Sequence, residues 1–496
     1  MKNSRASGIF LHPTSLPSPY GIGDLGLQAL RWIDQLAAAK QSFWQFCPLG
    51  PTGYGDSPYQ TLCSFAGNTL LISPQELRTM GLLSEAELQS YPKLPENHVN
   101  YGAVISEKEK LFRIAFDNFS NIPEFTEFCA KEASWLDGYA LFRVIKTLHG
   151  EQPWWSWEPA YKKREKSALA TVSEKFADDL RYHKFLQYLF HKQWRRVRAF
   201  AAKQGILLIG DVPFYTAYDS SDTWMEPKQF LFDKKGVPTG VAGVPPDYFS
   251  KTGQLWGNPL YKWDAMKKDG FSWWRRRIQK TLEFADYIRI DHFRAFDSYW
   301  AVPYGEQTAV NGKWCDGPGL RFFEAIKEKL GDLPFIAEDL GDITDGVNKL
   351  REEIGAPGMK ILQFAFDSNP DNPYLPYNIL KDSVTYTGTH DNDTSIGWFS
   401  TLSDATKKRV CGYIGSSNIH SEEKFIDAFI RCALASPSWL CIIPMQDILA
   451  LGGKHRMNTP ATMLGNWQWR MTQKMPIYER LEILSEWTQI YGRTTL

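Results

Sequence analysis

The segment 287–296 reads YIRIDHFRAF and places an arginine and an aspartate within an apolar strand pattern. Because successive side chains of a strand point to opposite faces, Ile288 and Ile290 share one face, and Arg289 and Asp291 share the other. Burying both charges in an ordinary apolar core costs on the order of several kcal/mol per ion. The pair is therefore either a structural ion pair at a strand end or part of a functional polar site.

Seven further segments have the length and apolar composition of buried strands. They are residues 6–11, 43–49, 206–210, 334–338, 361–366, 384–388 and 439–445. Helical patterns separate several of them, for example over 273–285. Eight strands alternating with helices predict an α/β protein with a (β/α)8 TIM barrel. A long doubly wound sheet is the alternative, although no GxGxxG or P-loop motif follows any of these strands.

We expect one catalytic barrel over residues 1–496 with two insertions. Residues 76–175 are mostly helical by pattern and more charged, which predicts a helical insertion. Residues 216–272 are rich in glycine, proline and aromatic residues, which predicts a loop insertion after the third strand. Residues 450–470 form a similar late loop near the predicted active site. Only about 50 residues follow the eighth strand, so no C-terminal β-sandwich is expected.

The charge balance and the cysteines limit the classes of partner and compartment. Lysine plus arginine and aspartate plus glutamate both number 56, so nothing favours a nucleic acid or an anionic membrane as partner. No obligate protein partner is evident. Seven cysteines without a CxxC pair indicate reduced thiols, a cytoplasmic protein, and neither a zinc site nor a disulfide framework. The apolar run near the N-terminus is too short for a signal peptide.

Aromatic residues are unusually frequent, at 14% of the chain. A large core is one explanation. Many of them, however, lie in loop-like segments such as WWSW at 154–157 and NWQW at 466–469. Exposed rings beside polar groups suit sugars, whose C–H faces are apolar and whose rims carry hydroxyls.

Acidic residues lie at the ends of four predicted strands. Asp211 ends the third, Asp291 the fourth and Glu338 the fifth, and Asp391 follows the seventh within THDND. One acid after a strand is typical of a helix cap or a turn. Four at one rim are hard to explain in that way, because crowded like charges destabilise a purely structural end. Active sites of barrels lie at this rim.

Two carboxylates that flank one bond are the requirement for cleaving a glycoside. In a retaining mechanism they lie about 5–5.5 Å apart, and neighbouring strands are about 4.8 Å apart. Asp291 and Glu338, on adjacent strands, can therefore act as nucleophile and general acid. We expect Arg289 to keep Asp291 ionised and expect Glu338 to have a raised pKa.

Nine motifs together resemble those of the amylomaltases, which are the 4-α-glucanotransferases or disproportionating enzymes of the α-amylase-like clan. They are FLHPTSLPSPYGIGDLG (10–26), GYGDSPYQ (53–60), IGDVPFY (209–215), WGNPLY (256–261), RIDHFRAF (289–296), IAEDLG (336–341), LQFAF (362–366), GTHDNDT (388–394) and NWQWR (466–470). The resemblance covers nearly the whole chain. It implies a (β/α)8 barrel and a retaining transfer of α-1,4-glucan segments, with maltooligosaccharides and other α-1,4-glucans as substrates in starch or glycogen metabolism.

The same resemblance implies roles for individual residues. Asp291 resembles the nucleophile, Glu338 the general acid/base and Asp391 the acid that stabilises the transition state. The residues similar to those lining the subsite of the attacked glucose are Tyr59, Asp211, Arg289 and His390, while Trp256 lies in a lid-like loop and Asn458 and Asn466 lie in the late loop.

Alternatives to a transferase are a hydrolase that uses the same acids and a glucan-binding protein without activity. The typical α-amylase carries a histidine soon after the aspartate of the third strand, and the segment 211–217, DVPFYTA, has none. This difference favours the transferase. Tyr54 and Tyr101 either form a second glucan-binding platform or pack loops.

Neither a cofactor nor a metal is expected. The segment 367–372, DSNPDN, begins like a calcium loop. The sixth and twelfth positions are, however, Asn372 and Asn378 rather than glycine and glutamate.

Overall fold

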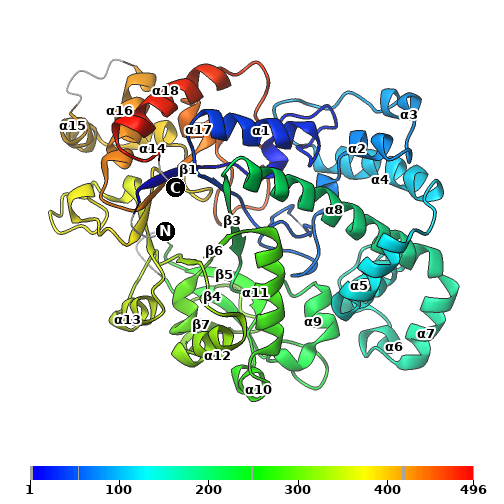
Figure 1. Ribbon diagram of the computed structural model, residues 1–496. Helices are drawn as coiled ribbons and strands as arrows, with labels where there is room; N and C mark the ends of the chain where they lie inside the picture. Colours follow the sequence, from blue (N-terminus) through cyan, green and yellow to red (C-terminus); the bar gives the residue numbers. More distant parts are fainter. Residues whose placement is uncertain (1–3, 54, 247–249, 416–420, 495–496) are drawn as a thin grey trace.

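The computed structural model describes residues 4–53, 55–246, 250–415 and 421–494 (Figure 1). Eight parallel strands close into a barrel in the order β1–β12–β11–β10–β9–β6–β3–β2. Their bounds are β1 (Ala6–Phe10), β2 (Phe43–Gln45), β3 (Leu207–Val212), β6 (Tyr287–Ile290), β9 (Phe335–Ala337), β10 (Gly358–Ile361), β11 (Ser383–Tyr386) and β12 (Leu440–Pro444). The barrel and its eight-strand count confirm the fold predicted from the sequence.

The sixth barrel strand was misplaced by the sequence analysis. It was expected at 361–366, but β10 ends at Ile361, and residues 362–364 form the 3-10 helix η6 (Leu362–Phe364). The strand begins at Gly358, where an added Cβ atom would lie 2.2 Å from Asp339 Oδ2. A side chain at this position would displace the carboxylate of Asp339, which follows β9, and a glycine weakens the strand signal in the sequence.

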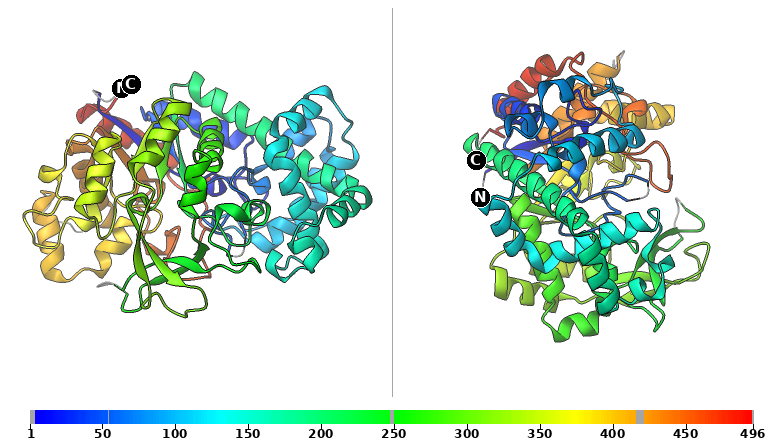
Figure 2. Two further views of the ribbon diagram at one scale, coloured as in Figure 1. Left: turned by 90° about the horizontal axis from the view of Figure 1, so that it is seen from below. Right: turned by 90° about the vertical axis from the view of Figure 1, so that its right-hand side faces the viewer.

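Helices surround the barrel (Figures 1 and 2). They are α1 (Leu27–Ala38), α8 (Ala177–Lys203), α11 (Ser272–Phe284), α12 (Leu320–Leu330), α13 (Asp345–Glu353), α14 (Ser395–Thr401), α15 (Asp404–Tyr413), α16 (Glu422–Ala435), α17 (Met445–Ile448) and α18 (Ile477–Ile490). In α1, Trp32, Ile33 and Leu36 are buried at the helical spacing seen in the sequence. Helix α1 packs between α8 and α18, so the first and last helices of the barrel are neighbours.

Residues 74–175 are mainly helical and extend to one side of the barrel (cyan in Figures 1 and 2). The helices are α2 (Pro74–Thr79), α3 (Glu85–Gln89), α4 (Tyr101–Asp117), α5 (Pro123–Leu148), α6 (Pro159–Lys162) and α7 (Lys166–Lys175). A buried ion pair of 2.7 Å between Glu132 of α5 and Lys280 of α11 fastens this region to the barrel. The helical region is thus packed against the barrel helices rather than tethered by a linker.

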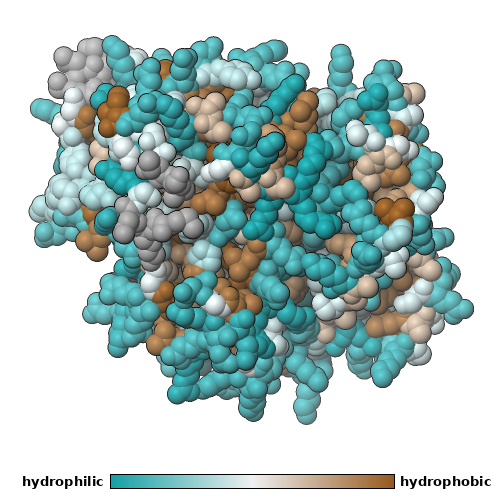
Figure 3. All heavy atoms as spheres, viewed as in Figure 1, coloured by the Kyte–Doolittle hydropathy of each residue, from teal (hydrophilic) through white to brown (hydrophobic). Residues whose placement is uncertain are grey.

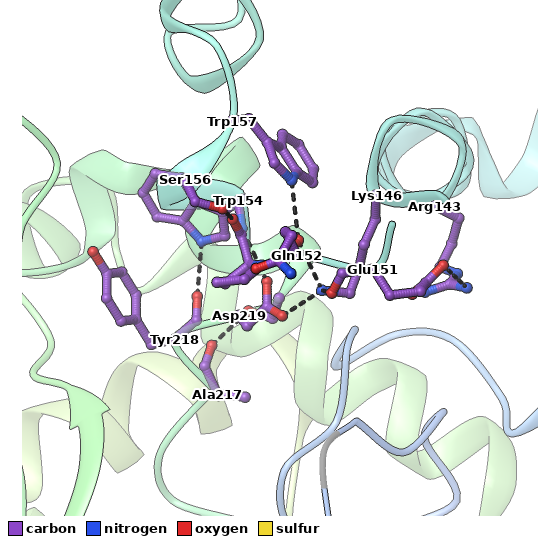
Figure 4. Close-up of polar contacts among 12 residues, drawn as sticks. Arg143, Lys146, Glu151, Gln152, Trp154, Ser156, Trp157, Ala217, Tyr218 and Asp219 are labelled. Carbon is purple, nitrogen blue, oxygen red and sulfur yellow. Dashed lines mark hydrogen bonds and ion pairs between the residues drawn. The ribbon is translucent and has the colours of Figure 1, made fainter. Parts of the chain in front are cut away.

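The tryptophans at 154–157 were expected to be exposed, and this was wrong for Trp154 and Trp157. These side chains are only 2% and 3% exposed, because they pack with Trp224 in a second hydrophobic core. Figure 4 shows how this loop is held: Trp154 Nε1 donates to the carbonyl of Tyr218, and Trp157 Nε1 donates to the carbonyl of Gln152. These rings therefore stabilise the helical region and do not form a surface for sugar.

A four-stranded antiparallel sheet lies beside the barrel, in the order β5–β4–β7–β8. Its strands are β4 (Gly240–Val244), β5 (Gln254–Pro259), β7 (Ser298–Pro303) and β8 (Lys313–Asp316). Two of them, together with α9 (Ser221–Met225) and α10 (Trp263–Lys268), lie in the range expected as a loop insertion. Strands β7 and β8 were not anticipated. Glycines obscure β4: a Cβ atom at Gly243 would lie 2.6 Å from the carbonyl oxygen of Gln254.

Polar and charged side chains cover most of the face shown in Figure 3. Within the described residues, none of the helices is long and apolar enough to span a membrane.

Candidate active site

The carboxyl ends of the barrel strands gather the acidic residues at one rim. Ile290 of β6 pairs with Ala337 of β9, so Asp291 and Glu338 follow at matching positions on neighbouring strands. Asp211 of β3 pairs with Arg289 of β6. The parallel pairing of β6 with β3 and β9 therefore brings the predicted residues together. This pairing cannot be read directly from the sequence.

Arg289 is the central cation of the site. Its Nη1 donates to Asp211 Oδ2 over 2.7 Å and lies 2.9 Å from Asp291 Oδ1. Tyr59 donates from its hydroxyl to the same Asp211 oxygen over 2.8 Å. Burial lowers the pKa of Arg289, but the charges of the two aspartates outweigh burial and raise it well above its ordinary value. Arg289 is thus charged at every accessible pH and pairs two carboxylates at once.

Glu338 is held by the backbone of the turn after β6. His292 adopts the left-handed conformation, with φ of 51°, and its N–H donates to Glu338 Oε2 over 2.7 Å. Burial raises the pKa of Glu338 to about 8, with the charge of Asp291 adding to the rise and Arg289 opposing it. The carboxyl group is therefore mostly protonated at neutral pH, which agrees with the raised pKa expected from the sequence.

Asp291 differs from expectation in the direction of its pKa. Burial raises it to about 6, and the charges of Asp211 and Asp391 add to the rise, so that Arg289 lowers it only in part. A group with this pKa is still mostly ionised at pH 7. The two neighbouring carboxyl groups, Asp291 and Glu338, therefore occupy opposite protonation states at neutral pH, because their environments separate their pKa values.

Asp391 lies in a third environment. Its Oδ1 accepts a hydrogen bond of 2.7 Å from Asn458 Nδ2, and its Oδ2 lies 3.3 Å from His390 Nε2. Burial raises the pKa of Asp391, but His390 and Asn458 more than offset this and place it below the ordinary value. The late loop is further joined to this acid by Arg456 Nη2, which donates to the carbonyl of Asp391 over 3.1 Å.

Aromatic rings pack around His390, and the Trp467 side chain, at 4% exposure, is buried among them rather than exposed as the sequence suggested. Tyr59 stacks on His390, with ring centroids 5.1 Å apart and planes inclined by 17°. Trp467 lies 5.7 Å from Tyr59 and 5.8 Å from His390, and its backbone is left-handed, with φ of 63°. This conformation is uncommon for a bulky residue and marks a constrained site. The sequence pointed to the segment of Trp467 but not to its position beside both of these rings.

Of the remaining candidates, one lies near the acids, and the others stabilise the surrounding loops. Trp256 lies on β5, with its ring 4.8 Å from that of His292, next to the turn that holds Glu338. Asn466 is not at the acids: its Oδ1 accepts from the N–H of Thr459 and stabilises the late loop. Tyr101 is only 6% exposed and donates from its hydroxyl to the carbonyl of Trp467, so it is not an exposed platform.

Tyr54, the other proposed platform residue, lies outside the described residues. The sequence did not point to Asp447, a buried residue that supports the turn after β11. Asp447, at 1% exposure, accepts hydrogen bonds from the hydroxyls of Thr387 and Ser395 over 2.6 and 2.7 Å. These bonds fix both ends of the turn that carries His390 and Asp391. No sequence motif marked Asp447, because its partners become neighbours only in the fold.

The segment that begins like a calcium loop uses its acceptors internally. Side-chain oxygens of Asp367, Asn369 and Asn372 accept hydrogen bonds from the backbone N–H groups two residues later. Across the described part of the chain, no cluster of three or more histidine, cysteine, aspartate or glutamate side chains is arranged to hold a metal ion.

Comparison with known proteins gives one consistent family. A family model described as 4-alpha-glucanotransferase matches residues 11–475. The chain is 46% identical to the 4-alpha-glucanotransferase of Synechocystis sp., with 99% of each chain covered. It is 45% identical to that of Thermus thermophilus, with 95% of each covered.

Solved structures agree with these relatives. The amylomaltase of Streptococcus agalactiae in complex with acarbose has a TM-score of 0.95 and 38% identity, covering 99% of this chain and 100% of that chain. The amylomaltase of Corynebacterium glutamicum, at 17% identity and a TM-score of 0.80 over 98% of this chain and 75% of that one, supports the fold alone.

Proposed function

Because the chain belongs to the 4-alpha-glucanotransferase family, we propose that Asp291, Glu338 and Asp391 perform its transfer reaction. The enzyme moves a segment of a 1,4-α-D-glucan to the 4-hydroxyl of another glucan or of glucose. Family membership favours this transfer over the hydrolase and the inactive binding protein that the sequence left open.

In the first step, the Asp291 carboxylate attacks the anomeric carbon of the donor. The bond from that carbon to the glycosidic oxygen breaks, and Glu338 gives its proton to the departing oxygen. In the second step, the Glu338 carboxylate takes the proton from the 4-hydroxyl of the acceptor. The acceptor oxygen then attacks the anomeric carbon and releases Asp291, which returns both groups to their starting states.

The observation that carries this proposal is the contrast between two neighbouring carboxyl groups. Asp291 is paired with Arg289 and has a pKa of about 6, whereas Glu338 has a pKa of about 8. Between these values, the nucleophile is ionised and the acid is protonated, which is the combination that the first step needs.

The other site residues would bind the attacked glucose. Asp211 Oδ1 is buried and has no hydrogen-bond partner among the described residues, so it is available to a sugar hydroxyl. Asp391 is oriented by Asn458 and His390. We assign to it the hydrogen bonds with sugar hydroxyls that strengthen as the ring distorts. Trp256, next to His292, would cover the bound chain as a lid.

Several finer points extend the family's action on α-1,4-glucans. We propose maltooligosaccharides as substrates, and no nucleic acid or membrane as partner. We also propose a cytoplasmic location, since all seven cysteines are free thiols. For the domain organisation, we propose a single catalytic barrel with helical residues 76–175 and residues 216–272 as insertions and 450–470 as an active-site loop.

The test is incubation with maltotriose while following glucose, longer oligomers and total reducing ends. We expect a ladder of longer oligomers at a constant number of reducing ends, and we expect Asp291→Asn to abolish it. Asp342→Asn is the matched control, because Asp342 lies near the same rim with a side chain that is 82% exposed. Unchanged turnover in the Asp291→Asn enzyme would refute the assignment of the nucleophile.

A further inference from the structure

The longest of the sequence motifs, at 10–26, has no part in the site described above, and it lies against the end of the late loop. We call residues 10–26 the N-terminal motif and residues 467–471 the anchored segment. The hydroxyl of Ser15 donates to the carbonyl of Trp469 over 2.8 Å. The N–H of Met471 in turn donates to the carbonyl of Ser15 over 2.9 Å. The N-terminal motif therefore binds the anchored segment through side chain and backbone.

The helical region binds the same segment through residues 97–99. The N–H of Arg470 donates to the carbonyl of Asn97 over 3.1 Å, and the N–H of Val99 donates to the carbonyl of Gln468 over 2.8 Å. The anchored segment is thus held by two parts of the chain that lie far from it in the sequence.

The side chain of Arg470 joins these two parts of the chain directly, and it is only 1% exposed. Its Nη2 donates to the carbonyls of Ser18 and Leu16 over 2.8 and 3.4 Å, and its Nη1 donates to the carbonyl of Pro95 over 3.0 Å. Burial lowers the pKa of Arg470 to about 10, and nearby acidic groups offset this only in part. Because a buried cation is costly unless it is hydrogen-bonded, the bonds to three carbonyl groups fix the position of this guanidinium.

The anchored segment also closes the late loop at its base. The N–H of Trp467 donates to the carbonyl of Met457 over 2.7 Å. The next residue, Asn458, donates from its N–H to the carbonyl of His390 over 3.1 Å and from Nδ2 to Asp391 over 2.7 Å. A shift of the anchored segment would therefore displace Asn458 and change the orientation of the Asp391 carboxylate.

We propose that Arg470 is a positioning residue for the transfer reaction. By joining the anchored segment to the N-terminal motif and to the helical region, its guanidinium keeps Asn458 in place to orient Asp391. A displacement of about 1 Å at a reacting group can lower a rate by about a hundredfold, even when the substitution is remote. The proposal rests on the role assigned above to Asp391, and it gives the N-terminal motif a function, which is to hold the late loop.

The test compares Arg470→Met with Lys108→Met in the full-length enzyme. Lys108 is the matched control, because it is also a buried cation, at 0% exposure, and donates to the carbonyls of Leu70 and Ile72 over 2.7 and 2.8 Å, away from the late loop. We expect both substitutions to lower the Tm. Only Arg470→Met should lower kcat/KM for maltotriose, by about ten- to a hundredfold, whereas Lys108→Met should stay within about twofold of the unmodified enzyme.

A double-mutant cycle separates positioning from a general loss of stability. If Arg470 acts through Asn458, adding Asn458→Ala to Arg470→Met should lower kcat/KM little further. Losses that multiply fully would overturn the proposal, as would a kcat/KM of Arg470→Met that matches that of Lys108→Met. If Arg470→Met fails to fold, Ser15→Ala removes the bond to Trp469 and should lower kcat/KM about fivefold in the same cycle. Full turnover in Asp391→Asn would instead refute the role proposed for Asp391.

Discussion

Replacing Arg289 by glutamine removes the cation that two carboxylates of the cleft share. The guanidinium of Arg289 lies 2.7 Å from Asp211 and 2.9 Å from Asp291, and its side chain is 4% exposed. An adjacent arginine lowers the pKa of an aspartate by about 1–3 units. Without it, the pKa of Asp291 should rise from about 6 to 7 or above. Arg289 also opposes the raised pKa of Glu338, so that value should rise as well.

The direction in which kcat/KM changes with pH follows from the protonation states of Asp291 and Glu338 that the first step requires. The first step needs Asp291 ionised, which holds above its pKa, and Glu338 protonated, which holds below its pKa. We therefore expect a bell-shaped profile of kcat/KM for the unmodified enzyme, with limbs near the pKa values of about 6 and 8. Because the groups interact, the limbs report the pair rather than either residue alone. In Arg289→Gln, both limbs should move to higher pH.

The expected fall in kcat/KM of Arg289→Gln at pH 7 has two causes. A rise of one unit in the pKa of Asp291 leaves about half of the nucleophile ionised. Loss of a charged hydrogen bond, typically about 1.5–3 kcal/mol, lowers kcat/KM by a further factor on the order of ten to a hundred. The assay is transfer from maltotriose between pH 5 and 9. Arg289→Lys, which keeps the charge, should hold the acid limb near its original position. An acid limb in Arg289→Gln that stays in place or moves to lower pH would refute the reasoning.

Three further substitutions test other parts of the account. Glu338→Gln should lower kcat by about 10²–10⁴-fold and remove the alkaline limb, with a smaller loss for a glycosyl fluoride donor, whose leaving group needs less protonation. Asn458→Ala should lower kcat/KM by on the order of tenfold, because Asp391 loses the hydrogen bond of 2.7 Å that orients it. Gly358→Ala should lower the free energy of unfolding by about 1–3 kcal/mol, measured by thermal denaturation, since its Cβ would lie 2.2 Å from Asp339 Oδ2.

Simple results would contradict the predictions for Glu338→Gln and Gly358→Ala. An alkaline limb that survives in Glu338→Gln would assign the proton to another group. For the glycine, Gly102→Ala is the matched control, because Gly102 lies in α4 with only the side-chain oxygen of Asn100 within 4 Å, at 3.8 Å. That substitution should raise stability by about 0.5–1 kcal/mol. Equal thermal shifts in the two variants would show that the contact with Asp339 is unimportant.

Local patterns in the sequence were enough to predict the barrel and its acids. Alternation around Arg289 placed two charges on one face of a strand, and the rule that parallel strands end at one rim brought Asp291 near Glu338. Neither step requires knowledge of long-range contacts. The same alternation identified the strand β6, which begins at Tyr287, the first residue of the segment 287–296.

The misses share a physical cause, which is that distant segments determine the local structure. Strand β10 begins with a glycine, Gly358, that lies close to the side chain of Asp339, a contact absent from the local sequence pattern. The sequence around Trp154 is typical of an exposed loop, but in the fold Trp224 and Tyr218 pack with it in a hydrophobic core. The pKa of Asp291 depends on the summed effect of burial and of several charges, so identifying Arg289 alone gave the wrong direction.

The most direct test of the central claim is to trap the covalent intermediate. Glu338→Gln enzyme is incubated with a 5-fluoro-α-glycosyl fluoride, which forms the first bond readily and releases it slowly, and the labelled peptide is then sequenced by mass spectrometry. The account predicts a single glycosyl adduct on the carboxylate of Asp291. An adduct on Asp211 or Asp391, or turnover without any adduct, would contradict it.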